Sequence, residues 1–128
     1  MYLTKESEHE YRFGDHGPKY LTQGPNVDLG VVIITPGEHH PCHLHETHEE
    51  SFLALEGECQ VWVNGELTLM KAGDFMICAP CEAHYFENVS DSNFKAVFVK
   101  APHPKEKDSI YIDWKPGQVY DSSKRVVK

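Results

Sequence analysis

The sequence predicts an all-β domain, and three features of the 128-residue chain support that prediction. Short apolar segments rich in β-branched residues recur along it, such as Gly-Val-Val-Ile-Ile-Thr at 30–35. Turn signals containing Gly, Pro or Asn separate these segments at intervals of roughly eight to twelve residues. Almost no segment has the apolar period of an amphipathic helix. Together these features indicate a β-sandwich or a β-barrel.

The first expected strand spans Val27–Thr35 and ends at a Pro-Gly turn at 36–37. Asn64-Gly65 is the strongest hairpin signal in the chain, because a two-residue Asn-Gly loop suits the twist of two paired strands. Residues 1–19 are polar and contain Gly14, Gly17 and Pro18, so we expect no regular element there. The remaining expected strands are Glu50–Leu55, Cys59–Val63, Glu66–Met70, Phe75–Ala79, His84–Asn88 and Phe94–Lys100.

The chain after Ala101 has a different composition. Two prolines and the charged run Lys105–Asp108 predict a linker, and Ser109–Trp114 predicts a short edge strand. The apolar side chains of this strand need burial, either on the outer sheet or across a dimer interface. The length suits one domain. We therefore expect a single domain, 1–128, with a core at about 27–100, an N-terminal arm at 1–26 and a C-terminal extension at 101–128.

Three histidines and one glutamate form the pattern that bears most directly on chemistry. His43 and His45 are one residue apart, Glu50 follows five residues later, and His84 lies far downstream. Alternate side chains of a strand share a face, so an H-x-H pair presents two imidazoles about 7 Å apart along the chain. A carboxylate and a third imidazole complete a set of N and O ligands for one divalent transition metal ion. Such a set suits Fe, Mn, Ni, Cu or Zn, and affinity alone does not select among them.

The spacing of these residues resembles the cupin superfamily, in particular its small single-domain members. The first cupin motif, G-x5-H-x-H-x3,4-E-x6-G, is matched by Gly37, His43, His45, Glu50 and Gly57. The second, roughly G-x5-P-x-G-x2-H-x3-N, is matched at Gly73, His84 and Asn88. Pro80 falls one place late and Cys81 occupies the second glycine position, so the turn before His84 departs from the pattern.

The resemblance covers about residues 27–100 and implies a double-stranded β-helix, the jelly-roll barrel of the cupin type. It implies that His43, His45, Glu50 and His84 are the metal ligands. It also implies a homodimer, because jelly rolls of this family often pair. The reaction types that it suggests are dioxygen insertion, decarboxylation and isomerisation, and the sequence does not choose among them.

Further residues are candidates for the pocket or for contacts around the ligands. Glu49 also falls within the permitted spacing, but only Glu50 lies seven residues before Gly57. His39 shares strand parity with His43 and is expected at the pocket mouth, and His48 is expected in the bend after His45. His9, His16 and His103 are expected on the surface. The apolar candidates for the pocket wall are Phe52, Met76, Phe86 and Phe98.

Four cysteines raise a second question. Cys78-Ala-Pro-Cys81 has the C-x-x-C form of a redox pair or of half a zinc site. The redox interpretation requires a helix that begins at the first cysteine, whereas the preceding residues predict a strand. A zinc site made of four thiolates requires a second C-x-x-C, which this sequence lacks. We therefore expect reduced, buried thiols.

Composition restricts the partners. The formal net charge of −8 disfavours nucleic acid or an anionic membrane as the main partner, because both select basic patches. No apolar run approaches the roughly eighteen residues of a membrane-spanning helix. The N-terminal Met-Tyr-Leu-Thr-Lys-Glu lacks the apolar core of a signal peptide. We expect a cytoplasmic protein with a small-molecule ligand and neither a nucleic-acid nor a membrane partner.

The ligand set also restricts the chemistry. Three neutral imidazoles and one carboxylate leave a net charge of about +1 on a divalent ion and two neighbouring octahedral positions for other ligands. Bidentate oxygen donors such as hydroxy acids, catechols or diketones suit those positions. The leading hypothesis is a metal-dependent enzyme acting on a small oxygen-rich molecule. The alternatives are a noncatalytic sensing or ligand-binding barrel and a metal-free relative of sugar-nucleotide epimerases.

Overall fold

The computed structural model describes residues 1–126, and its regular elements are strands apart from one short 3-10 helix. Its elements are the 3-10 helix η1 (Glu6–Glu8) and the strands β1 (Gly17–Gln23), β2 (Asp28–Ile34), β3 (His39–Leu44), β4 (Glu49–Glu56), β5 (Glu58–Val63), β6 (Glu66–Lys71), β7 (Phe75–Cys78), β8 (His84–Glu87), β9 (Phe94–Ala101) and β10 (Ile110–Tyr111). The prediction of an all-β domain is confirmed.

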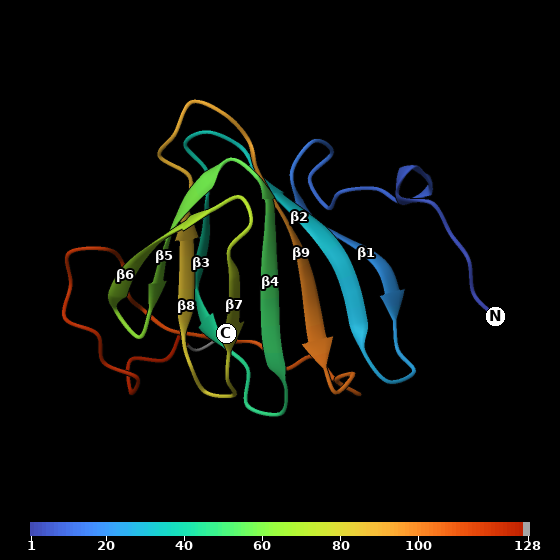
Figure 1. The fold of residues 1–128 in the computed structure, drawn as a ribbon. Helices are drawn as coiled ribbons and strands as arrows, with labels where there is room; N and C mark the ends of the chain where they lie inside the picture. Colours follow the sequence, from blue (N-terminus) through green and yellow to red (C-terminus); the bar gives the residue numbers. More distant parts are fainter. Residues whose placement is uncertain (127–128) are drawn as a thin grey trace.

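The strands form two five-stranded antiparallel sheets (Figure 1). One sheet has the order β1-β2-β9-β4-β7 and the other has the order β10-β3-β8-β5-β6. Consecutive strands therefore often lie in different sheets, as when β3 is followed by β4 across the barrel. This arrangement is the jelly-roll barrel that the sequence resemblance implied.

The main core fills the space between the two sheets. Strand side chains alternate between the two faces of a sheet, so every second residue of β2, β4 and β9 points inward. Apolar side chains at those inward positions exclude water from the interior, which stabilises the barrel. The buried members of this cluster are Val32, Ile34, Phe52, Ala54, Cys59, Val61, Met70, Cys78, Phe86, Phe94, Ala96 and Phe98.

The predicted hairpin between β5 and β6 is confirmed. Val63 pairs with Glu66 across the two-residue loop Asn64-Gly65. Asn64 has φ 49° and Gly65 has φ 81°, and a type I′ turn requires positive φ at both positions. The local sequence therefore sets the register of this hairpin.

The expectation that residues 1–19 lack regular structure is wrong. β1 begins at Gly17 and pairs with β2 at the edge of its sheet, so the expected N-terminal arm contributes a strand. Pro18 is compatible with this position, because an edge strand leaves one side of the backbone unpaired. Lys19 is buried, and its ammonium group lies 3.4 Å from a Glu6 carboxylate oxygen and 4.3 Å from the centre of the Tyr11 ring.

The C-terminal extension packs on the outer face of the second sheet. β10 pairs with β3, and Ile112 and Trp114 are buried against Leu44 and Tyr85. The Trp114 and Tyr85 rings meet edge to face with their centroids 5.6 Å apart. Of the two locations that the sequence left open for these side chains, the outer sheet is the observed one. The paired strand is shorter than the expected Ser109–Trp114.

We predict that two glycines of the first motif respond differently to substitution. Gly57 has φ +75°, and an added Cβ would lie 2.2 Å from the backbone oxygen of Asn93, whereas Gly37 has φ +84° and open space around it. Gly37→Ala should therefore lose about 1–2 kcal/mol of unfolding free energy from its backbone conformation alone. Gly57→Ala should lose about 1–3 kcal/mol more, because backbone must shift to relieve the clash. Urea unfolding measures both values, and equal losses would contradict the prediction.

Candidate metal centre

The four predicted ligands come from both sheets and converge at one point. His43 lies on β3 opposite His84 at the start of β8, and His45 directly follows β3. Glu50 lies on β4 in the facing sheet. Each residue offers one ligand atom, and the four atoms lie within 4.8 Å of one another. His45, Glu50 and His84 are buried, and His43 is partly buried.

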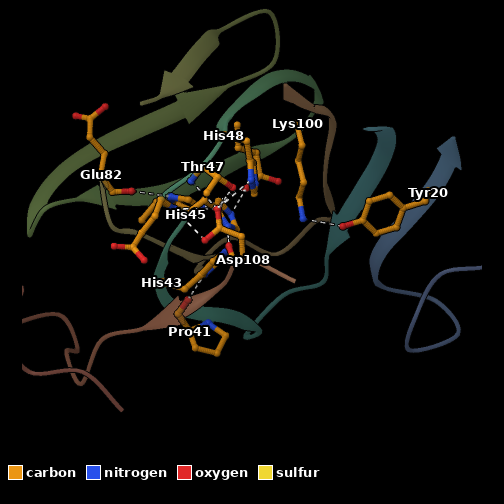
Figure 2. Close-up of polar contacts among 12 residues, drawn as sticks. Tyr20, Pro41, His43, His45, Thr47, His48, Glu82, Lys100 and Asp108 are labelled. Carbon is orange, nitrogen blue, oxygen red and sulfur yellow. Dashed lines mark hydrogen bonds and ion pairs between the residues drawn. The ribbon is translucent and has the colours of Figure 1, made fainter. Parts of the chain in front are cut away.

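Backbone carbonyl groups orient all three imidazoles. The Nδ1–H of His43 donates to the Pro41 carbonyl at 2.8 Å, and that of His84 donates to the Glu82 carbonyl at 3.2 Å. The Nδ1–H of His45 donates to the carbonyl of Asp108 (Figure 2). A carbonyl oxygen only accepts, so each Nδ1 carries the hydrogen and each Nε2 of a neutral ring presents a lone pair. Such second hydrogen bonds fix the orientation of metal-binding histidines.

The carboxylate of Glu50 lies among these lone pairs. Its Oε1 is 3.1 Å from Nε2 of His45 and 3.3 Å from Nε2 of His84. A hydrogen on Nε2 or a cation between the groups makes this contact favourable, whereas a bare lone pair and a carboxylate oxygen repel each other. Nε2 of His84 is buried and makes no hydrogen bond within residues 1–126. The four side chains therefore form a donor set that suits a cation at its centre.

The spacing fits a divalent metal ion. With bonds of roughly 2.1 Å, adjacent ligand atoms are about 3.0 Å apart and opposite ones about 4.2 Å apart. The two Glu50 contacts match adjacent positions, and the whole set lies within the observed 4.8 Å. Three imidazole nitrogens and one carboxylate oxygen, without a thiolate, suit Fe, Mn, Ni, Cu or Zn.

Burial and neighbouring groups keep two of the ligands, His43 and Glu50, in the protonation states that metal binding requires. Burial lowers the pKa of His43 well below its usual 6.5, and the neighbouring His84 lowers it further. Burial by itself raises the pKa of Glu50. Hydrogen bonds with the ring nitrogens of His45 and His84, together with the charge of Lys100, lower this pKa by more than burial raises it. The pKa of Glu50 therefore lies well below its usual 4.5. At neutral pH His43 is neutral and Glu50 is ionised, as ligands must be.

The ligand cluster lies in the wall of a cavity of about 660 Å³. Phe52, Phe86 and Phe98, three of the four apolar candidates, line the cavity and also belong to the main core. His48 also lines it, and its ring stacks on that of His45 with 4.3 Å between their centroids. A largely aromatic wall beside one polar cluster is typical of sites that bind small molecules.

Three other expected positions differ in the structure. His39 is exposed and stacks on Tyr85 on the outer face, because the register of β3 against β8 shifts between His40 and His43. His40 lines the cavity in its place, and burial lowers the pKa of His40 to about 4. Glu49 is exposed and does not line the cavity. Met76 is partly buried and packs against the main core instead.

The C-terminal segment 103–109 covers one side of the cavity, which the linker prediction did not anticipate. Asp108 accepts hydrogen bonds from the N–H groups of Glu46 and Thr47, the latter at 2.7 Å, and from the Thr47 hydroxyl at 2.6 Å (Figure 2). His103, expected as a surface residue, instead binds the buried carboxylate of Asp28 at 2.6 Å. No local pattern signals these partners, because they are separated by more than sixty residues.

The cysteines are free thiols, as expected. Cys42, Cys59 and Cys78 are buried, and burial raises the pKa of Cys78 to about 12, which makes it a poor nucleophile. Cys81 is exposed, contrary to the expectation of burial. It adopts φ +71° at the position where the second motif has glycine, and its N–H donates to the His45 carbonyl at 2.6 Å. The turn before His84 therefore forms without that glycine.

The chain belongs to the cupin family: the model of the cupin domain matches residues 30–100. It is 29% identical over 94 residues to an uncharacterized protein of Aquifex aeolicus, covering 73% of this chain and 74% of that protein. It is 39% identical over 62 residues to gentisate 1,2 dioxygenase 1 of Aquipseudomonas alcaligenes, but this match covers 48% of this chain and 18% of that enzyme. The chain thus corresponds to about a fifth of the dioxygenase.

A solved structure from Klebsiella pneumoniae, described as an uncharacterized conserved protein with a double-stranded β-helix domain, shares the fold with a TM-score of 0.71. The two sequences are 24% identical, and the match covers 83% of this chain and 94% of that one. Family and ligand cluster together identify a cupin with a metal-binding centre. The described part of the chain contains no helix long and apolar enough to span a membrane.

We predict that Asp108→Asn lowers the unfolding free energy at pH 6 by about 1.5–3 kcal/mol, the usual value of a hydrogen bond to a charged group. Burial alone raises the pKa of Asp108, but hydrogen bonds from Thr47 and Glu46 lower it from 3.8 to about 2. A carboxylate with a depressed pKa stabilises the fold above its unfolded pKa, and this stabilisation disappears as the pH falls through about 2.

Urea unfolding at several pH values between 6 and 3 tests this. The difference between wild type and Asp108→Asn should be constant near pH 6 and clearly smaller at pH 3. Asp91→Asn, at an exposed carboxylate, is the matched control and should change stability little at either pH. A difference for Asp108→Asn that stays the same down to pH 3 would contradict the assignment.

Proposed function

We propose that this cupin is an iron-dependent dioxygenase that acts on a small molecule with two adjacent oxygen donors. The observation that carries the proposal is the convergence of His43, His45, Glu50 and His84 in the wall of a 660 Å³ cavity. Around an octahedral ion these four ligands would leave two neighbouring positions for the substrate or dioxygen. Iron(II) bound there supplies a Lewis acid for the substrate oxygens and a redox partner for dioxygen.

The residues of the chain have separable tasks in this proposal. Glu50 contributes the one negative charge, so that a divalent ion keeps a net charge of about +1 and attracts anionic oxygen donors. The Phe52 and Phe98 rings exclude water from the inner part of the cavity and provide apolar surface for the substrate. His40, whose pKa of about 4 keeps it neutral, adds a polar wall without a second positive charge.

The likeness to gentisate 1,2 dioxygenase 1 favours dioxygen insertion over the decarboxylase and isomerase alternatives. A dioxygenase places both atoms of O₂ in its product, so the substrate supplies all the electrons and no further reductant is needed. A noncatalytic ligand-binding barrel has the same ligand set but consumes no oxygen. Oxygen uptake therefore separates the two functions.

We predict that protein purified without a histidine tag, stripped of metal and loaded anaerobically with Fe(II), binds one iron per chain. On exposure to air it should consume oxygen with at least one member of a panel of catechols, dihydroxybenzoates and diketones. His45→Ala and Glu50→Gln should each lower iron affinity by more than about 100-fold, since even the loss of a hydrogen-bond partner of a ligand costs 10–100-fold.

Iron content by mass spectrometry and uptake at an oxygen electrode provide the two measurements. His39→Ala is the matched control, because this histidine belongs to the same cluster in the sequence but is exposed outside the cavity. Wild type that holds no iron would contradict the proposed iron centre. Wild type that holds iron and binds the compounds without consuming oxygen would favour the noncatalytic barrel.

We also propose that the protein is a homodimer, and the support is an apolar surface on the outer face of β4 and β7. Leu53 pairs with Phe75 across these strands, and both side chains are exposed, at 40% and 61%. Leu55 and Ile77 extend the surface. β7 is the last strand of its sheet, so a second copy has free access to this face.

We predict that Phe75→Lys converts the dimer to a monomer in sedimentation equilibrium, because a charge at the centre of an apolar contact loses its hydration on association. Val119→Lys, at a residue 89% exposed near the C-terminus, should leave the mass unchanged. Circular dichroism checks that both variants keep the β fold. A wild-type protein that is monomeric at all concentrations would contradict the proposal.

A further inference from the structure

Lys100 occupies a distinctive place in the cavity. It lies on β9 between two carboxylates, since its backbone pairs with Glu50 of β4 on one side and with Asp28 of β2 on the other. Residues directly opposite in an antiparallel pair project from the same face of the sheet. Lys100 therefore points into the barrel beside the metal ligand Glu50, and it lines the same cavity.

The ammonium group of Lys100 influences the Glu50 carboxylate through its charge but is not paired with it directly. Within residues 1–126 it forms no ion pair, and its hydrogen bond is to the hydroxyl of Tyr20 at 2.8 Å (Figure 2). Asp28 is engaged by His103 at 2.6 Å, and the carboxylate of Glu50 faces the imidazoles. An ammonium group has three donors, so two of those on Lys100 remain for a ligand.

Tyr20 offers one more donor at the same place. Its hydroxyl oxygen accepts the hydrogen bond from Lys100, so its own hydrogen is available to a ligand. The ring is held by an edge-to-face contact with Phe98, with centroids 5.1 Å apart at 84°. Lys100 and Tyr20 thus form a fixed group of donors at one side of the cavity. A cation and a hydroxyl that donate together are suited to an anionic oxygen.

The surface beside this pair is aromatic. Phe52 and Phe98 are paired in the register of β4 and β9, two residues along from Glu50 and Lys100 and on the same face. A planar ring resting on these side chains would have the metal ligands and the donor pair within the same cavity. Charge, donors and shape therefore select a flat molecule with metal-binding oxygens in one part and an anionic group in another.

We infer that Lys100 and Tyr20 bind the carboxylate of the substrate, and that the substrate is an aromatic acid whose adjacent oxygens reach the metal. This inference rests on the proposed function, because it places the substrate on the metal centre. It adds the chemical class of the substrate and assigns its recognition to two residues outside the ligand set.

The test compares two ligands that share the chelating diol. Zn(II)-loaded protein is titrated calorimetrically with 3,4-dihydroxybenzoate and with 4-methylcatechol, which has a methyl group in place of the carboxylate. Wild type should bind the acid at least about tenfold more tightly, as one charge-assisted contact provides. Lys100→Met should abolish this preference, Lys100→Arg should keep part of it, and Tyr20→Phe should reduce it. Lys71→Met, which removes an exposed charge from β6, should leave the preference unchanged.

Equal affinity of wild type for the two ligands would overturn the inference, as would a preference that survives in Lys100→Met. Zinc content is measured before each titration. A further outcome is that Lys100→Met holds less zinc while its zinc-loaded fraction still prefers the acid over methylcatechol. That result would assign the lysine to charge balance for Glu50 and overturn the inference. Each of these outcomes overturns only the assignment of Lys100 and Tyr20. The metal-site proposal stands as long as wild type holds zinc and binds methylcatechol. Failure of wild type to hold zinc or methylcatechol would instead sink the proposed function and this inference with it.

Discussion

The contact between Glu50 and the histidine nitrogens is the interaction on which the centre depends. Glu50 comes from one sheet, whereas His43 and His84 come from the other. Its carboxylate lies 3.1 Å from Nε2 of His45 and 3.3 Å from Nε2 of His84. The two sheets must therefore stay in a fixed relation for the site to exist. The apolar core between them provides that relation, because a closely packed interior resists displacement of one sheet against the other.

The backbone also takes part in building the centre. All three imidazoles donate through Nδ1 to backbone carbonyls, and one of those carbonyls belongs to Asp108 in the C-terminal segment. The side chain of Asp108 meanwhile binds the bend that follows His45. The C-terminal segment thus closes the cavity wall and orients a ligand at the same time. A change in this segment should therefore affect the metal centre, although it lies outside the region that the cupin model matches.

The cavity is divided in its chemistry. The metal ligands occupy one part, phenylalanine rings line the inner wall, and Lys100 with Tyr20 supplies positive charge and donors nearby. In the proposed function each part would contact a different portion of the substrate, so the three together would select more strongly than a metal alone. Under the proposal above, a protein with a net charge of −8 would still attract an organic acid, because the charge inside the cavity differs from the charge of the whole chain.

The sequence by itself determined most of the strands, the hairpin at Asn64-Gly65 and, with the family resemblance, the four candidate ligands. Each rests on a local rule: apolar alternation, a turn that needs positive φ, or a ligand spacing carried on paired strands. The same rules failed at β1, where burial of Lys19 depends on Glu6 and Tyr11. They failed again at His39, because a register shift within β3 brings His40 into the cavity instead. A bulge inserts one residue and reverses which face the following side chains occupy, and tertiary packing decides where it falls. Asp108, Lys100 and Tyr20 likewise became visible only in three dimensions, because their partners are distant in the chain and no local pattern joins them.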